Sequence, residues 1–580
     1  MKTLVNLGLL FATAAGLAAA ADGKVAQDLS SQRGGIVDVI VQYTSAPTAH
    51  HHQKISSRGG VLKADLSGVI RGAAYSVPAS AIEDLARDPE IAYIAPDRPL
   101  QGMLNYTAAA VNAAVAWTQY NLDGTGIGVA VIDSGISDHP DLQSSAKHGG
   151  SRVLWNQDFV GGGTDDHYGH GGHVAGIVAG NGSDSSCNKC TITFMGIAPN
   201  ANLINLRVLD DNGNGTDSGV IAAIQTAIAL KNTYNIRVIN LSLGRPVFES
   251  YTMDPLCQAV EAAWKAGIVV VVAAGNEGRN NSAGTNGYGT ITAPGNDPYV
   301  ITVGAMKTME TPSRTDDLVA SYSSKGPTLI DHIAKPDLVA PGNLVVSLLM
   351  GTATLDKTYP QNDITKSYYG AASGKSMSNS YFRLSGTSMA APVVSGAAAL
   401  VLQRDPYLTP DQVKALLMKT AYKTFPQSSV AVDPITGMSY TSQYDLFTVG
   451  AGYLDIAAAL ANTNSLPAAA GSALSPTAVI LSIDGVPTVC VANTGLTAVW
   501  GSTAVWGSTT VWGSSVFVNS NTAVWGSTAV WGSTAVWGST AVWGSTAVWG
   551  STAVWGSTAV WGSASKTAAE TAAISIYGEN

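Results

Sequence analysis

Short apolar runs recur between alanine-rich stretches in the middle of the chain. Four of these runs are Gly128–Ile132, Asn202–Leu206, Val238–Leu241 and Ile268–Ala273. Continuous apolar runs of this length are typical of strands that are buried on both faces, and the stretches between them have the composition of helices. The pattern therefore predicts an α/β fold with a doubly wound, mostly parallel sheet over about residues 102–465.

A different pattern precedes this region, over residues 21–101. Ile36–Tyr43 alternates apolar and polar residues as a strand does, residues 81–86 have the composition of a short helix, and residues 91–94 resemble another strand. We expect a small α+β domain here.

Residues 1–20 have the pattern of a secretory signal peptide. Lys2 precedes an apolar stretch from Leu4 to Leu17, and the alanines at 18–21 offer small-residue cleavage sites. A membrane anchor is the alternative, but the stretch is short for a hydrocarbon core about 30 Å thick and ends in alanines rather than in basic residues. The sequence therefore predicts an exported protein that is secreted or held at the cell surface.

The C-terminal part of the chain changes character twice before it ends in a tail at 565–580. Residues 466–496 are rich in Pro, Ala, Ser and Thr, the composition of a linker or a small β element. Residues 497–564 repeat a Trp-Gly-Ser hexapeptide and hold 10 of the 13 tryptophans. An extended strand would place these rings on one side but about 20 Å apart. A solenoid or adhesion element that binds a surface or polymer, a flexible spacer and a secretion appendage all fit this repeat.

Charge and hydrophobicity exclude two further classes of protein. The chain carries 31 Lys and Arg against 40 Asp and Glu, a formal net charge of −9, and it contains no basic run. A nucleic-acid partner is therefore not expected, because such proteins present clustered basic residues to phosphates. A hydrophobic content of 46% excludes disorder of the whole chain.

The four cysteines are too few for a disulfide scaffold. Cys187 and Cys190 form a CxxC pair with no second pair to complete a metal site, so a small loop-closing disulfide is favoured over a metal half-site or a redox motif. Cys257 lies in an apolar context and is expected to be a buried thiol.

Four polar residues end predicted strands or begin predicted helices. They are Asp133, His170, Asn276 and Ser388. Doubly wound sheets collect such residues at the carboxyl ends of their strands, and a helix N-terminus offers N–H groups to an oxyanion. Each residue also has an ordinary alternative, namely a strand-to-turn transition for the aspartate, a turn for the asparagine and an N-cap for the serine. His170 and His173 lack the HExxH pattern of a zinc protease, so a zinc site is not expected.

In chain order, these four residues and their surrounding motifs resemble the subtilisin-like serine proteases, or subtilases, for which the order Asp, His, Ser is characteristic. The resemblance covers about residues 102–460 and includes the motifs at 196–201, 206–209, 240–244, 323–327 and 335–342. Residues 24–101 are similar to the inhibitory propeptide of that family. The resemblance implies that this propeptide inhibits the enzyme and is cut off near residues 100–106.

The resemblance also implies a role for each site residue. Ser388 would attack the scissile carbonyl, His170 would take and return the proton, and Asp133 would orient the imidazole. The Asn276 side chain and the Ser388 N–H would form the oxyanion hole.

Two further segments are expected to bind the peptide substrate. It would lie as an extended strand along Ser242, Leu243 and Gly244, beside a specificity pocket walled by Ala273, Ala274 and Gly275. The floor of this pocket, Thr292–Gly295, has no carboxylate, so we expect apolar or aromatic side chains to be accepted.

The chain departs from the family pattern at three places. Gly172 replaces the usual threonine, which predicts a looser helix start below His170. The polar stretch 344–383 is longer than in compact relatives and would form a lid, a loop on the leaving-group side or a spacer. Asp141 matches a calcium ligand of the family, but the loop from Cys187 to Thr193 does not resemble the usual partner loop, and a disulfide would serve there instead of an ion.

The sequence thus predicts a secreted serine endopeptidase of broad specificity that acts on proteins and peptides and requires no cofactor. The resemblance suggests one metal, a structural calcium ion bound by Asp141. Two other classes remain open, namely a structural or adhesive surface protein whose protease domain serves mainly to process itself, and an inactive relative used for binding.

Overall fold

The computed structural model describes two compact units, Met1–Gln101 (the small unit) and Gly102–Asn580 (the large unit). The described residues are 24–26, 29, 34–68, 70–96, 106–144, 150–187, 190–282, 284–370, 377–433, 436–463, 471, 473–483, 486–492, 515–519, 576, 578 and 579. The expected signal peptide and nearly all of the Trp-Gly-Ser repeat lie outside them.

The small unit is a four-stranded antiparallel sheet with helices packed against it. The strand order is β2 (Val61–Asp65), β3 (Gly72–Pro78), β1 (Ile36–Tyr43) and β4 (Ile91–Pro96). The helices are α2 (Ala49–Ser56), η1 (Ala79–Ala81) and α3 (Ile82–Ala86). The predicted strands β1 and β4 and the predicted helix α3 are present, whereas β2, β3 and α2 were not predicted. Val39, Val41 and Leu85 are fully buried at its centre, so this unit has a core of its own.

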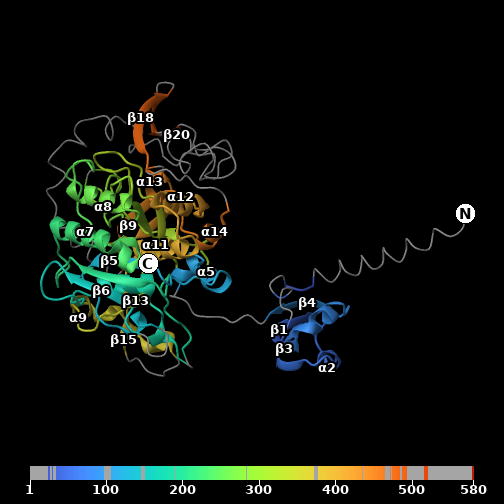
Figure 1. The fold of residues 1–580 in the computed structure, drawn as a ribbon. Coiled ribbons are helices and arrows are strands. Elements are labelled where there is room, and N and C mark those ends of the chain that lie inside the picture. Colours follow the sequence, from blue (N-terminus) through green and yellow to red (C-terminus); the bar gives the residue numbers. More distant parts are fainter. Residues whose placement is uncertain are drawn as a thin grey trace, which may run out of the picture. The chain divides into compact units, whose positions relative to one another are not determined.

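An eight-stranded sheet forms the centre of the large unit (Figure 1). Its order is β11 (Leu318–Val319), β10 (Ile301–Lys307), β9 (Val269–Ala273), β8 (Ile236–Leu241), β5 (Gly128–Asp133), β7 (Asn202–Arg207) and β6 (Val153–Asp158), and β12 (Leu338–Pro341) also pairs with β10. Every pair is parallel except β10 with β11. The four strands predicted from apolar runs are all present, and the predicted α/β fold is confirmed.

Two pairs of helices cover the sheet. Helices α6 (Gly171–Ala179) and α11 (Thr387–Arg404) pack against each other on one face, and α7 (Asp217–Tyr234) and α8 (Pro255–Lys265) pack together on the other (Figure 1). Nearly all residues of α6 and most of α11 are buried, because small side chains allow close packing on the strands. The starts of α6 and α11, which carry His170 and Ser388, therefore lie on the same face of the sheet.

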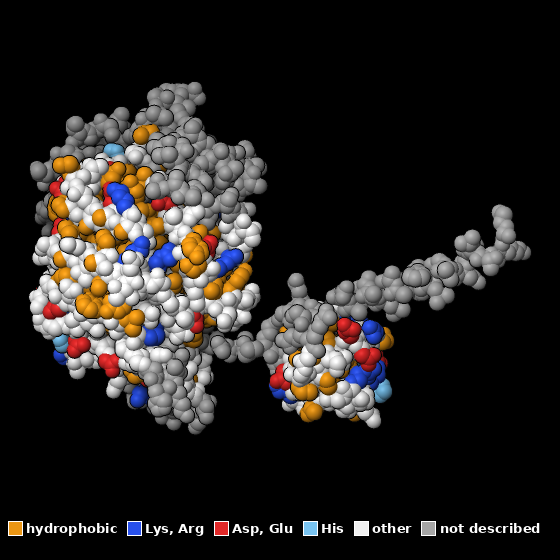
Figure 2. Space-filling model, in the orientation of Figure 1, with side chains coloured by type: hydrophobic (Ala, Val, Ile, Leu, Met, Phe, Trp, Pro, Cys, Tyr) orange, Lys and Arg blue, Asp and Glu red, His pale blue; other side chains and the backbone are white. Residues whose placement is uncertain are grey.

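Smaller elements complete the body of the large unit. They are α4 (Thr107–Ala110), α5 (Ala113–Gln119), η2 (Pro140–Leu142), η3 (Ser183–Ser185), α12 (Pro410–Thr420), β16 (Ser428–Val432), β17 (Ser439–Gln443), α13 (Leu446–Val449) and α14 (Ile456–Ala461). Among the described helices, none has the length and apolar content needed to cross a membrane. On the face shown in Figure 2, basic and acidic side chains are scattered among apolar and uncharged ones.

The described residues of the long polar stretch at 344–383 form helices and strands rather than a spacer loop, and the two ends of the stretch are largely buried. It forms β13 (Val345–Leu348), α9 (Thr354–Thr358), η4 (Pro360–Asn362), β14 (Asp363–Thr365), α10 (Lys366–Tyr369) and β15 (Met377–Leu384). The three strands make an antiparallel sheet in the order β13-β15-β14, and β13 packs against α6. Tyr369 and Tyr381 are buried against Phe194 and anchor this stretch to the large unit.

A three-stranded antiparallel sheet follows the body of the large unit. It consists of β18 (Thr477–Ile483), β19 (Val486–Ala492) and β20 (Ser515–Asn519). The second half of the expected linker is therefore a β element, and β20 lies in the irregular part of the repeat region. Residues 576, 578 and 579 lie against the body of the large unit, which the sequence did not predict.

Candidate active site

Asp133 is the last residue of β5, at the carboxyl edge of the sheet. Its side chain is 1% exposed. Oδ1 accepts hydrogen bonds from the Ser134 N–H and from Nδ1 of His170, both at 2.7 Å. Asp133 therefore fixes the orientation of the imidazole and the tautomer in which Nδ1 carries the proton, leaving Nε2 free to accept one.

His170 directly precedes α6, and a buried carboxylate holds the loop that carries it. Asp166 accepts hydrogen bonds from the Ser134 hydroxyl at 2.8 Å and from the N–H groups of Gly169 and Gly172 at 2.7 Å each. The Ser134 hydroxyl in turn accepts from the Gly171 N–H at 2.8 Å. This network satisfies N–H groups of the first turn of α6, which would otherwise lack partners.

The electrostatic surroundings favour the protonated form of His170. Burial by itself lowers the pKa of this imidazole, but the carboxylates of Asp133 and Asp166 outweigh the burial and raise its pKa above the ordinary value. Burial raises the pKa of Asp166 as well, against the hydrogen bonds that it accepts. The arrangement thus stabilises an imidazolium, which is what a base needs after it has taken a proton.

Gly172 does not loosen the start of α6 as the sequence predicted. A Cβ atom at this position would lie 2.4 Å from Cγ of Met350, whose side chain occupies the space of the missing one. The Gly172 N–H is fixed on Asp166. The next residue, His173, is fully buried, and its Nε2 lies 3.2 Å from the carbonyl oxygens of Val345 and Phe382. Burial and the neighbouring His170 lower the pKa of His173 to about 3, so it is a neutral core residue.

Ser388 is the second residue of α11. Gly386 before it has a φ of +147°, a conformation that favours glycine at this turn. The Ser388 hydroxyl donates to the Ser242 carbonyl oxygen at 3.2 Å, and among the described residues it has no hydrogen bond to His170. A rotation of this hydroxyl towards Nε2 is therefore required before proton transfer. Catalytic hydrogen bonds often tighten in this way only when substrate binds.

Asn276 follows β9 and presents its amide beside the start of α11. Its Oδ1 accepts from the N–H and the hydroxyl of Thr387 at 2.9 and 3.1 Å. Because a backbone N–H can only donate, the atom that faces it must be the oxygen, and Nδ2 is the group that remains to donate elsewhere. Both Asn276 and Ser388 are partly exposed. The site thus offers a side-chain donor and the first N–H groups of a helix to a negatively charged oxygen.

The expected substrate-binding segments adjoin these residues. Ser242 donates its hydroxyl to the Ser388 carbonyl oxygen at 2.7 Å, whereas Leu243 is partly exposed and Gly244 is exposed. Ala273 and Ala274 are buried, and Gly275 has a φ of +106°.

The expected pocket floor lies beside its expected wall. The Thr292 N–H donates to the Ala274 carbonyl oxygen at 3.1 Å. A Cβ atom at Gly244 or Gly275 would lie 2.6 or 2.8 Å from side-chain atoms of Thr292, so both glycines are required by close packing.

The expected calcium ligand Asp141 belongs to a cluster with His139 and Asp184, whose ligand atoms lie within 4.8 Å of one another. Asp141 is fully buried, and both of its oxygens are already engaged. Oδ1 accepts from the Asp184 N–H and the Ser183 hydroxyl, and Oδ2 accepts from the Tyr381 hydroxyl at 2.8 Å. A calcium ion needs six to eight oxygen ligands. This cluster therefore does not fit calcium, because protein donors occupy the oxygens that would bind it.

The predicted disulfide between Cys187 and Cys190 is present. It follows Asp184 closely in the sequence. Cys257 is a buried free thiol, as predicted.

Comparison with known proteins decides the family. The model of the subtilase family matches residues 124–452. The chain is a subtilase. Serine protease AprX of Bacillus subtilis is 39% identical over 329 residues, which cover 55% of this chain and 67% of the relative. Subtilisin E of the same organism is 33% identical over 429 residues, which cover 73% of this chain and 93% of the relative.

A solved cold-adapted subtilisin-like serine proteinase is similar over 52% of this subtilase and 84% of its own chain, at 30% identity and a TM-score of 0.36. Membership of the family makes this subtilase a serine-type endopeptidase.

Two features of the subtilase site were not found from its sequence. Asp166 lies four residues before His170, the N-cap residue of α6, and so lies outside the position at which a capping residue is expected. Met350 lies far from Gly172 in the sequence but next to it in the structure, and no local pattern indicates such a contact.

Proposed function

We propose that this subtilase hydrolyses peptide bonds with Asp133, His170 and Ser388 as its catalytic residues. The observation that carries the proposal is the 2.7 Å hydrogen bond between Asp133 and His170 on the face of the sheet where Ser388 lies in the first turn of α11. An oriented imidazole beside a hydroxyl at a helix N-terminus is the arrangement that nucleophilic acyl transfer requires.

In the first half of the reaction, Nε2 of His170 takes the proton of the Ser388 hydroxyl as Oγ bonds to the scissile carbonyl carbon. The carbonyl oxygen becomes negative, and it accepts from Nδ2 of Asn276 and the Ser388 N–H. His170 then gives its proton to the leaving nitrogen, the C–N bond breaks and an acyl-enzyme remains. In the second half, water gives a proton to His170 and its oxygen bonds to the acyl carbon. The bond between that carbon and Oγ of Ser388 then breaks, and His170 returns its proton to Oγ, which releases the peptide acid and restores Ser388.

The proposal extends to specificity. Ala273 and Ala274 are buried and apolar, and the neighbouring Thr292–Gly295 carries no charge. A pocket with such walls binds apolar and aromatic side chains, because nothing in it would pair with a buried Lys or Arg. We expect a substrate with Phe before the scissile bond to exceed its Lys counterpart by about tenfold or more in kcat/KM.

The proposal also includes a secreted precursor that processes itself. Three features support it, namely the signal-like residues 1–20, the separate compact small unit, and the boundary between the units at Gln101 and Gly102. The small unit would act as the inhibitor of the large unit until the chain is cut between residues 100 and 106.

Expression of the full chain with Ser388→Ala tests the proposal. We expect an uncut precursor and no hydrolysis of an added denatured protein, whereas the unchanged chain and the matched surface variant Ser313→Ala give a cut product and full activity. Hydrolysis by the Ser388→Ala chain would disprove the assignment.

A further inference from the structure

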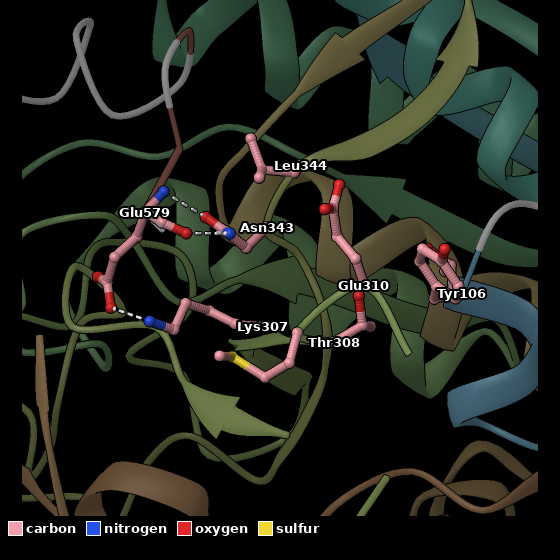
Figure 3. Close-up of a pocket in the computed structure, with 9 residues that line it drawn as sticks. Tyr106, Lys307, Thr308, Glu310, Asn343, Leu344 and Glu579 are labelled. Carbon is pink, nitrogen blue, oxygen red and sulfur yellow. Dashed lines mark hydrogen bonds and ion pairs between the residues drawn. The ribbon is translucent and has the colours of Figure 1, made fainter. Parts of the chain in front are cut away.

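The last residues of the chain lie in the large unit, far in sequence from the elements that they contact (Figure 3). Ile576 is 3% exposed within the main hydrophobic core, and its carbonyl oxygen accepts from Nδ2 of Asn362 at 2.6 Å. An apolar side chain in the core and a satisfied carbonyl group indicate a specific position for this residue.

Gly578 fits its position only because it has no side chain. Its φ is +64°, and a Cβ atom would lie 2.5 Å from Cδ2 of Leu344 and 2.6 Å from Oγ of Ser385. Both the backbone conformation and the close approach select glycine here.

Glu579 is bound through its main chain and its side chain (Figure 3). The Asn343 amide pairs with the main chain, because Nδ2 donates to the Glu579 carbonyl oxygen at 2.7 Å and Oδ1 accepts from the Glu579 N–H at 2.8 Å. The side chain is inserted among cationic groups, with Oε1 2.8 Å from Nζ of Lys307 and Oε2 3.1 Å from Nη2 of Arg279. The N–H and hydroxyl of Ser321 also donate to Oε2.

The binding groups are themselves buried and well held. Arg279, Lys307 and Ser321 are 8%, 4% and 2% exposed, and Glu579 is 2% exposed. Arg279 is fixed from its other side by an ion pair with Asp433 at 3.0 Å. Buried cationic groups are costly unless carboxylates neutralise them, so these groups favour an acidic residue at the position of Glu579.

The site is connected to the catalytic machinery through two loops. Arg279 lies three residues after Asn276, and Ser385, which touches Gly578, lies three residues before Ser388. A cavity of about 220 Å³ adjoins the site between Glu579, Lys307 and Glu310. Glu579 and Gly578 thus lie against residues that are close in sequence to the oxyanion donor and to the nucleophile.

The chain is already attached to the large unit before the repeat begins. The Ser475 N–H donates to the Pro298 carbonyl oxygen at 3.0 Å, and the Ala478 N–H donates to that of His332 at 2.7 Å.

We propose that Arg279, Lys307, Ser321 and Asn343 form a peptide-binding site for a Gly-Glu sequence, and that the chain's own C-terminal segment 576–579 occupies this site. The chain is then held on the large unit on both sides of the Trp-Gly-Ser repeat. A cut within the repeat would not release the piece that carries Glu579.

A cleavable form of the full chain tests this proposal. The recognition sequence of an unrelated, site-specific protease is inserted between residues 568 and 569 of the Ser388→Ala chain, which cannot digest itself. After cutting, we expect native mass spectrometry to find the C-terminal piece still bound. The same piece should dissociate from a Glu579→Gln chain but remain bound in the control Glu310→Gln, which alters an exposed glutamate at the rim of the cavity.

A peptide competition avoids any effect of the substitution on folding. A synthetic peptide with the sequence of residues 573–580 should displace the bound piece from the cut chain. A peptide with Gln at the position of Glu579 should bind about 100-fold more weakly or worse, because it removes the carboxylate that faces Lys307 and Arg279 and leaves Asp433 as the acidic partner of Arg279. Loss of the piece from the cut chain on dilution, or equal competition by the two peptides, would overturn the proposal.

Discussion

Replacement of Asn276 by leucine should remove the oxyanion donor while leaving most of the site in place. Oδ1 of Asn276 is held by the N–H and hydroxyl of Thr387, so Nδ2 has one defined direction and needs no reorganisation during the reaction. Loss of one such preorganised donor costs about 2.7–4 kcal/mol in the transition state, or about a hundred- to a thousandfold in kcat. KM should change little, because the donor stabilises a charge that develops only after binding.

The variant Thr387→Val provides a graded comparison. It keeps the N–H that holds Oδ1 of Asn276 at 2.9 Å and removes the hydroxyl that donates to the same oxygen at 3.1 Å. The change also removes the oxygen that accepts from the Gly275 N–H at 3.1 Å, so the variant should lose some stability as well. The loss of the one hydrogen bond that orients Asn276 corresponds to about 0.5–1.5 kcal/mol, so kcat should fall by about two- to tenfold.

Steady-state hydrolysis of a chromogenic peptide with Phe before the scissile bond measures both effects. The thermal unfolding midpoint of each variant shows whether its fold is intact. Retention of more than about a tenth of kcat by Asn276→Leu, or a rise in KM that accounts for the loss, would refute the assignment of Nδ2 as oxyanion donor.

Three further outcomes follow from the electrostatics of the site. His170 must be neutral to accept a proton and its pKa is raised, so kcat/KM should fall as the pH drops through a midpoint above about 6.5, the ordinary value for histidine; a midpoint at or below that value would contradict this. Asp166→Asn removes a negative charge that raises the pKa of His170, so the midpoint of the pH profile should move to lower pH. The midpoint should stay unchanged in the control Asp165→Asn, at the exposed neighbouring position. The same pH profile for both variants would argue against a role for Asp166. Tyr381→Phe leaves a buried oxygen of Asp141 without its donor, so urea unfolding should show a loss of about 1–3 kcal/mol in the free energy of unfolding. A loss below about 0.5 kcal/mol, the size expected for an ordinary surface substitution, would contradict the hydrogen bond between Tyr381 and Asp141.

The sequence predicted the parts of the fold that local patterns determine. The four apolar runs became β5, β7, β8 and β9, because a strand buried on both faces has no polar positions to obscure it. Asp133, at the end of such a strand, was placed correctly at the edge of the sheet for the same reason.

Features that depend on distant contacts were not predictable. Helix α2 contains three successive histidines, and its start is capped by the His51 imidazole rather than by the usual Glu or Gln. The stretch 344–383 reads as a polar loop, yet Tyr381 is buried by contacts with Phe194 and Asp141. Glu579 gives no local signal either, since an acidic residue near a chain end is ordinarily solvated.

Labelling with a fluorophosphonate probe tests the central claim most directly, because such a probe forms a bond only with a serine activated by its neighbours. The account predicts one adduct per chain in the active protein, located by peptide mass spectrometry on Ser388, and loss of the adduct in His170→Ala. An adduct on another serine, or undiminished labelling in His170→Ala, would contradict it.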